Sequence, residues 1–232
     1  MTLLDRIHCW HRFWRYRLVT ERESVQFLLR QNLTKTTAID IGANKGAYTY
    51  WLSKAVGNNG QVISLEPQPE LAPFLDQLVN TFRLKNVLVV NQAASESATE
   101  HHMSRKFAGH GGAKITKNEG DLKIGSVTLD ELQATIQHRV SYIKCDVEGH
   151  EFEALKGARY ILEKNQPIVQ VEVHHQAAVD GQLFDFMDSL GYRGFFLFEG
   201  RKIPIGQLQL FTYPRSDNHR NYFFSKQNFR EL

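Results

Sequence analysis

The stretch "AIDIGANKGAYTYWLSK", residues 38–54, decides the fold of this 232-residue chain. A short apolar strand interrupted by Asp40 leads into a turn where Gly42 and Gly46 flank small residues, and a helical pattern follows. Units of this kind build parallel α/β sheets, whose ligands bind at the carboxyl ends of the strands. Glycine lets the backbone of such a turn approach a ligand and adopt a positive φ. We therefore expect a ligand site at this turn.

Beyond this unit, strand and helix patterns alternate along the chain. Apolar runs predict further strands, at 60–67, 86–95, 140–149, 167–174 and 221–226, and amphipathic patterns predict helices between them. A hairpin is expected at 194–205, turning at Glu199 and Gly200. This alternation predicts an α/β fold with a doubly wound, mostly parallel sheet, helices on both faces, and an antiparallel edge formed by the late hairpin and the terminal strand.

Residues 1–33 are predicted to be a helical extension to a domain at 34–232. Within the extension, residues 6–18 ("RIHCWHRFWRYRL") interleave arginines with large aromatic residues. One interpretation is an amphipathic helix that touches a membrane surface or a large substrate. The favoured one is a helix that caps the domain, because Glu21 and Glu23 dilute the positive charge. Such a cap would expose its arginines and bury three aromatic residues: Trp10, Phe13 and Trp14.

The composition excludes several classes of protein. A net charge of +3 gives no argument for a nucleic-acid partner. The two cysteines, Cys9 and Cys145, have neither disulfide-framework nor metal-site spacing. No apolar run reaches the roughly 18 residues of a membrane span, and no signal-peptide core is seen. We therefore expect a cytoplasmic protein.

The glycine turn does not match the fingerprints of nucleotide-phosphate sites. The spacing from Gly42 to Gly46 fits neither G-x-G-x-x-G nor the phosphate-binding loop, and Asp40 would repel a phosphate. Glu66 ends the second strand, where an acid can accept both hydroxyls of a ribose. The implied ligand has a ribose and a positive charge and lacks phosphate, which fits S-adenosylmethionine. An NAD-dependent oxidoreductase remains as a disfavoured alternative.

Six segments in this order resemble the FkbM family of class I methyltransferases: "DIGANKGAYT" (40–49), "SLEPQPE" (64–70), "NQAAS" (91–95), "TLDEL" (128–132), "KCDVEGHEFEALKGA" (144–158) and "QVEVH" (170–174). The resemblance extends over about residues 36–225. It implies a Rossmann-like seven-stranded sheet and S-adenosylmethionine-dependent methyl transfer, often to a hydroxyl. It also implies a small-molecule or glycan acceptor, such as a sugar or a polyketide-type natural product.

The resemblance assigns the cofactor to residues at the strand ends. Glu66 matches the ribose ligand, and Gln92 and Ala93 match the segment beside the adenine. The remaining cofactor residues implied are Asp40, Gly42, Ala43, Asn44, Gly46 and Asp146.

A second acidic cluster is expected to carry the chemistry. Asp146 and Glu148 follow the fourth strand, Glu172 and His174 lie two apart on the fifth, and the four side chains are expected to meet above the sheet. His174 or Asp146 could take the acceptor's proton. Alternatively, Asp146, Glu148 and Glu172 could hold Mg²⁺ or Ca²⁺, but we favour base catalysis.

Other acceptors are weighed on motifs. The sequence after the fourth strand reads "DVEG", without the Pro-Pro of amino-methyltransferases that act on nucleic acids, and no Pro-Cys nucleophile is present. A base substrate is therefore not expected. N-methylation of a protein lysine or a small amine is the nearest alternative. The polar stretch at 101–125, either a flap or a small hairpin, is expected to face the substrate.

Overall fold

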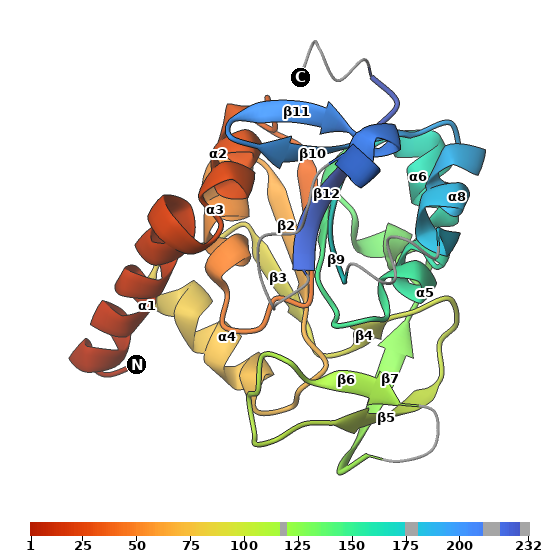
Figure 1. The fold of residues 1–232 in the computed structure, drawn as a ribbon. Coiled ribbons are helices and arrows are strands. Elements are labelled where there is room, and N and C mark those ends of the chain that lie inside the picture. Colours follow the sequence, from red (N-terminus) through yellow and green to blue (C-terminus); the bar gives the residue numbers. More distant parts are fainter. Residues whose placement is uncertain (117–119, 175–180, 211–218, 228–232) are drawn as a thin grey trace.

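The computed structural model of the protein describes residues 1–116, 120–174, 181–210 and 219–227. Eight strands of this part of the chain form the main sheet: β1 Thr37–Ile41, β2 Gln61–Leu65, β3 Val87–Val90, β8 Val140–Cys145, β9 Ile168–His174, β10 Arg193–Phe198, β11 Arg201–Pro204 and β12 His219–Ser225. Their order in the sheet is β11-β10-β12-β9-β8-β1-β2-β3 (Figure 1).

The sheet is parallel from β3 to β9 and antiparallel beyond β9. The expected doubly wound α/β fold is confirmed, with eight strands in place of seven, because β11 pairs with β10 and adds an outer strand. The hairpin turns at Glu199 and Gly200, as expected, and both have positive φ. The terminal strand β12 lies inside the sheet, between β9 and β10.

Helices cover both faces of the sheet (Figure 1). One layer contains α1 Leu3–Arg15, a π-helical turn Tyr16–Thr20, α2 Arg22–Arg30, α3 Ala47–Val56 and α4 Leu71–Thr81. The other contains α5 Glu151–Lys156, α6 Arg159–Asn165 and α8 Gln182–Ser189. Successive strand residues point to opposite faces, so Ala38 packs in the first layer's core and Ile39 in the second's. Both faces of β1 and β2 are thus buried, as their continuous apolar runs require.

Two predicted helices differ from the structure. The pattern at 150–164 indicates one helix. In the structure α5 ends at Lys156 and α6 begins at Arg159, so the helix is interrupted at Gly157 and Ala158. A Cβ on Gly157 would overlap the carbonyl oxygen of Ser95, so the close approach of that segment requires glycine. The pattern after Thr128, with Glu131 three residues on, indicates a capped helix. The structure has a 3₁₀ helix there, Asp130–Thr135, and Thr128 and Glu131 exchange hydrogen bonds as this pattern predicts.

The N-terminal segment packs on α3. Phe13 is fully buried, its ring stacks 4.2 Å from that of Tyr50, and its carbonyl accepts a 2.9 Å hydrogen bond from Trp51 Nε1. The expectation that Trp10 and Trp14 are also buried is wrong, because each is 42% exposed. The helix is therefore a cap through Phe13 and leaves a second apolar face outside.

A small second sheet lies below the main sheet in Figure 1, next to the ends of its parallel strands. It comprises β4 Ala93–Ala94, β5 Glu100–Ser104, β6 Lys114–Thr116 and β7 Leu122–Val127, in the order β4-β7-β5-β6. The polar stretch at 101–125 therefore contains antiparallel strands. Of the two alternatives, a flap or a small hairpin, the structure agrees with the hairpin. A further 3₁₀ helix spans Ile205–Leu210. In the described part of the chain, no helix is both long enough and apolar enough to span a bilayer.

Candidate functional site

A cavity of about 310 Å³ opens where the parallel strands end. The main sheet contributes four carboxylates to its wall: Asp40, Glu66, Asp146 and Glu172. The N-terminal segment adds Arg12, Tyr16, Thr20 and Glu21, and the small sheet adds Met103 and Ile115. Its volume is at the lower end of the roughly 300–1,000 Å³ typical of small-molecule sites.

Gly42 allows the turn after β1 to lie against the end of β8. Its φ is +80°, and a Cβ there would overlap the carbonyl oxygen of Asp146. The amides of Gly42 and Ala43 each donate a 3.0 Å hydrogen bond to the carbonyl of Leu65, which ties the turn to β2. Gly42, Ala43 and Asn44 consequently all line the cavity.

Gly46 lies outside the cavity lining of the described residues. It has a φ of +73° and precedes α3, and a Cβ on it would lie 3.0–3.1 Å from Leu78 and Leu75 of α4. The second glycine of the turn therefore provides a left-handed entry to α3 and close helix packing.

Asp40 is a buried carboxylate at the cavity wall, with 1% exposure. Its Oδ2 accepts a 2.6 Å hydrogen bond from Thr49 Oγ1. Burial raises the pKa of Asp40 to about 6, although the bond from Thr49 and the charge of Lys144 act in the opposite direction. A cation bound in the cavity would favour its ionised form.

Glu66 is fixed by two backbone amides. Its Oε2 accepts from the amide of Asn44 at 2.8 Å and its Oε1 from the amide of Gln68 at 3.0 Å. Burial raises the pKa of Glu66, and these two amides partly offset the effect. Each carboxylate oxygen keeps a lone pair, so the oriented group can still accept hydroxyl donors from a ligand.

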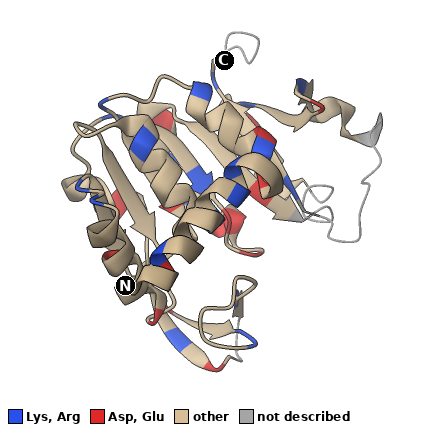
Figure 2. Ribbon diagram, turned by 90° about the vertical axis from the view of Figure 1, so that its left-hand side faces the viewer, with Lys and Arg blue, Asp and Glu red and all other residues tan. Residues whose placement is uncertain are grey.

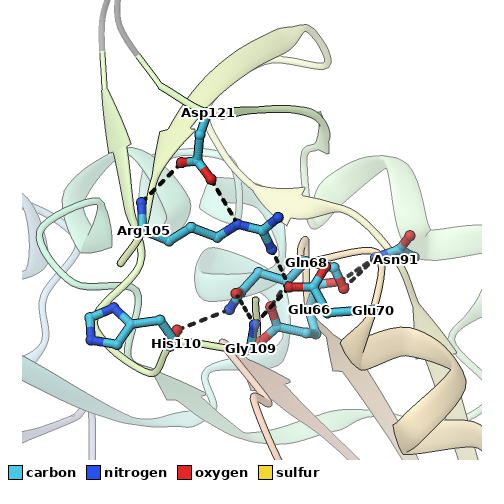
Figure 3. Close-up of polar contacts among 8 residues, drawn as sticks. All are labelled: Glu66, Gln68, Glu70, Asn91, Arg105, Gly109, His110 and Asp121. Carbon is cyan, nitrogen blue, oxygen red and sulfur yellow. Dashed lines mark hydrogen bonds and ion pairs between the residues drawn. The ribbon is translucent and has the colours of Figure 1, made fainter. Parts of the chain in front are cut away.

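The segment after Glu66 also binds the loop that precedes β6 of the small sheet (Figure 3). Gln68 Oε1 accepts from the amide of Gly109 at 3.1 Å, and Gln68 Nε2 donates to the carbonyl of His110 at 3.1 Å. Glu70 accepts from Gly109 at 2.7 Å and forms an ion pair with Arg105. These contacts hold the loop whose Gly111 and Ala113 line the cavity.

Gln92 and Ala93 line the cavity at the start of β4. Ala93 is buried, and Gln92 Nε2 donates a 3.4 Å hydrogen bond to the carbonyl of Ser126 in β7. This segment joins the main sheet to the small sheet, so it forms the wall between them.

Lys144 is a site residue that sequence reasoning missed. Its side chain is 2% exposed, and its Nζ lies 3.1 Å from Asp146 Oδ2 and 4.9 Å from the ring centre of Tyr48. Burial disfavours its charge, but four carboxylates more than offset that cost and raise the pKa of Lys144: Asp146, Glu172, Asp40 and Glu21. An ammonium therefore sits at the centre of the acidic cluster.

Asp146 and Glu172 each follow a residue of the paired positions Cys145 and Val171 of β8 and β9, and both line the cavity. Burial, and then the charge of Asp146, raise the pKa of Glu172 to about 9. At neutral pH this raised pKa favours a protonated Glu172, because two adjacent carboxylates can share one proton.

Glu148 also lines the cavity, although not for the expected reason. The strand β8 ends at Cys145, and Glu148 has a φ of +56°, so the segment is not extended. Burial and the charge of Asp146 raise the pKa of Glu148.

The expected fourth member, His174, ends β9, but its side chain lies outside the described part of the structure. The metal alternative needs three or more clustered ligands. Among the described residues, no three side chains of His, Cys, Asp or Glu are placed so that they could hold a metal ion together. Lys144, moreover, already provides positive charge to Asp146.

The extension contributes polar groups that were not anticipated at the site. Glu21 Oε2 accepts from Tyr48 OH at 3.2 Å and from Asn221 Nδ2 at 2.8 Å. The Nη1 atom of Arg12 is buried, lacks a hydrogen-bond partner among the described residues, and belongs to a cavity-lining side chain. The arginine-rich pattern of residues 6–18 was the signal that could have indicated Arg12. Nothing in the sequence showed which of these arginines turns toward the cavity.

Comparisons with known proteins agree with this architecture. The family model described as "Methyltransferase FkbM domain" matches residues 40–194. The hexuronic acid methyltransferase AglP of Haloferax volcanii is 27% identical over 170 residues, which cover 72% of this chain and 67% of AglP.

Two solved structures show the same fold. The methyltransferase FkbM of Methylobacillus flagellatus has a TM-score of 0.58 at 17% identity, with 84% of this chain covered but only 45% of that one. A Streptococcus mutans protein described as a methyltransferase, solved with SAH, has a TM-score of 0.55 at 10% identity, with coverages of 89% and 97%. With the family model matching well over half of its length, this chain belongs to the FkbM methyltransferase domain family.

Proposed function

We propose that this protein transfers a methyl group from S-adenosylmethionine to a hydroxyl of a sugar, glycan or related natural product. The observation that carries the proposal is the joining of two groups of residues in one cavity. Asp40 and Glu66 lie near the carboxyl ends of β1 and β2, and the Lys144, Asp146 and Glu172 cluster lies near the carboxyl ends of β8 and β9. The relative AglP, a hexuronic acid methyltransferase, supports a sugar acceptor.

The cofactor fits the first group. Glu66, oriented by two amides, would accept the ribose hydroxyls, and the buried carboxylate of Asp40 would favour the ligand's positive charge. The backbone of Ala43 and Asn44 would contact the methionyl part, and Gln92 would border the adenine. Bound there, S-adenosylmethionine supplies an electrophilic methyl group.

The acceptor would be activated at the second group. With Glu172 protonated and Lys144 holding the charge of Asp146, the Asp146 carboxylate is the group able to accept the proton of the acceptor hydroxyl. The acceptor's O–H bond breaks as its oxygen bonds to the methyl carbon, and the sulfur–methyl bond electrons remain on sulfur. The cavity walls would hold the two reactants in line.

An amine acceptor is less well supported. A lysine or small amine would arrive as an ammonium, but Asp146 already pairs with the buried ammonium of Lys144. A second cation beside the first would be repelled. The NAD-dependent alternative does not survive the family assignment.

Calorimetry tests the cofactor half of the proposal. S-adenosylhomocysteine should bind and NADH should not, and Glu66→Gln or Asp40→Asn should each weaken binding by about 1–3 kcal/mol. Glu96→Gln is the control, since Glu96 lies outside the cavity in an exposed pair with Lys156. Unchanged affinity in both site variants would refute the cofactor assignment.

The acceptor half is tested by turnover. We expect Asp146→Asn to retain S-adenosylhomocysteine binding and to lose methyl transfer to a panel of uronic-acid and neutral glycosides, followed by mass spectrometry. EDTA should leave turnover unchanged. Methylation of lysine peptides in place of the glycosides would overturn the choice of acceptor.

A further inference from the structure

The outer face of α1 carries an exposed row of large apolar side chains. We call this row the apolar stripe: Leu3, Ile7, Trp10, Trp14 and Leu18. Their spacing of three or four residues places them along one side of the helix and the turn that follows. Leu4 and Val19 widen the row, and the seven side chains are 42–72% exposed.

The stripe is exceptional for this molecule. Ten large hydrophobic side chains are exposed in the described part of the chain, and seven of them belong to residues 3–19. Scattered exposed apolar residues are normal, but a contiguous set marks an interaction surface. The helix α1 lies at the left edge of the fold in Figure 1, and Figure 2 looks onto that side of the molecule.

The stripe is held in place by the core beneath it. Cys9 and Phe13 are the buried residues of α1. Trp10 packs edge-on against Tyr50 and Phe82 at 5.7 Å each, which leaves the rest of its ring outside. The surface is therefore a fixed part of the fold.

Basic residues border the stripe. Arg6, Arg15 and Arg22 are exposed beside it, and the guanidinium of Arg17 lies 5.1 Å from the Trp14 ring centre. Residues 1–23 contain five arginines against three acids, Asp5, Glu21 and Glu23. The segment therefore combines apolar side chains with a net positive charge of two (five minus three).

We propose that the apolar stripe docks this protein on an anionic lipid surface. A helix with an apolar row bordered by arginines lies in the plane of a membrane interface, and tryptophan favours that depth because its ring is apolar and its N–H is polar. A second copy of the chain is a poorer occupant, since it would bring the same arginines against each other. The 13 residues of α1 give a contact about 20 Å long.

Docking would bring the cavity close to the lipid surface. The segment that carries the stripe also contributes Arg12, Tyr16 and Thr20 to the cavity wall. An acceptor attached to a lipid would thus meet the cavity from the side on which the protein is anchored. The docking itself does not depend on the methyl-transfer chemistry, so it can be tested without an acceptor.

The experiment uses the full chain and lipid vesicles. The protein should co-sediment with vesicles of phosphatidylcholine and phosphatidylglycerol, and less with phosphatidylcholine alone or at high salt. The three tryptophans are Trp10, Trp14 and Trp51, of which the first two are exposed. Intrinsic fluorescence should therefore shift to the blue on binding and be quenched by brominated lipids.

Variants separate the stripe from general adhesion. Ile7→Ser with Leu18→Ser should weaken vesicle binding by about tenfold or more, and Arg15→Glu should do so on anionic vesicles. Tyr160→Ser, which removes an exposed ring far along the chain, should not. Equal thermal unfolding and equal S-adenosylhomocysteine affinity in all variants would show that the fold is intact.

Two results would overturn the proposal. The first is no binding to anionic vesicles, or binding that the Ile7→Ser and Leu18→Ser variant retains. The second is a dimer in sedimentation equilibrium that this variant dissociates, without lipid binding by the wild-type chain. That result would assign the stripe to a second copy.

Discussion

Lys144 and Asp146 face the same cavity from the end of β8, with the lysine Nζ 3.1 Å from a carboxylate oxygen of Asp146. The pair is asymmetric, because Lys144 is 2% exposed whereas Asp146 is 34% exposed. The ammonium is thus enclosed, and the carboxylate it holds remains accessible to a ligand.

Replacing Lys144 by Met should destabilise the protein strongly. The change leaves buried carboxylates without their cation, and breaking such a pair costs about 3–5 kcal/mol. Urea unfolding would measure the loss. The control is Lys156→Met, whose pair with Glu96 is exposed and should contribute less than about 1 kcal/mol. Similar losses in the two variants would contradict the central position of Lys144.

Glu172 should make stability depend on pH. Its pKa rises from 4.5 to about 9 on folding, so between these values the folded state binds a proton that the unfolded state has released. This contribution to stability is present below the lower value and is lost as the pH rises toward the upper one.

Glu172→Gln removes this titration while keeping a neutral side chain. In urea unfolding from about pH 6 to about pH 8.5, the wild type should lose more stability than the variant. Parallel pH profiles would show that Glu172 is ionised in the native protein.

Gly42 should be far less replaceable than Gly191, which has the same positive φ of +80°. Both Gly42→Ala and Gly191→Ala place an alanine at this φ, which costs about 1–2 kcal/mol. Only at Gly42 would the new Cβ overlap a backbone atom, since no heavy atom lies within 4 Å of the corresponding position at Gly191. Thermal unfolding should therefore show a small loss for Gly191→Ala and a much larger one, with loss of cofactor binding, for Gly42→Ala.

Arg12→Met should separate binding from stability. Arg12 Nη1 is buried without a partner among the described residues, so removing it should leave the unfolding free energy unchanged or raised. A ligand carboxylate would be the missing partner, and its affinity should fall about tenfold or more.

Two ligands reveal the source of that carboxylate. If Arg12 meets the cofactor, the variant should lose affinity for S-adenosylhomocysteine but not for 5′-methylthioadenosine, which lacks the amino-acid part. If it meets the acceptor, KM for an acidic acceptor should rise. Arg15→Met, on an exposed residue, is the control, and unchanged values throughout would exclude a binding role.

The order of the elements could be predicted because it depends on local patterns. Buried strands such as β1 and β2 are short apolar runs, and the hairpin turn at Glu199 and Gly200 is marked by its own residues. The close contact between Gly157 and the carbonyl of Ser95 could not be predicted, since Ser95 comes from another part of the chain.

The presence of three carboxylates in the cavity wall could be predicted because they lie at or near the carboxyl ends of strands: Asp40, Glu66 and Glu172. Lys144 was not, because a lysine inside an apolar strand reveals its role only when its partners are known. Glu21 is a similar case: its partner Asn221 lies 200 residues away. The sequence pattern predicts that the charged side chains of the extension lie on the surface. In the structure two of them, Arg12 and Glu21, line the cavity.

The bond between Glu21 and Asn221 joins the first helical segment to the last strand of the sheet. Since β12 must insert between β9 and β10, this corner of the cavity can assemble only after Asn221 has left the ribosome. Contacts of such long sequence separation form late in folding. Newly made molecules should therefore lack a complete ligand site until β12 has inserted into the sheet.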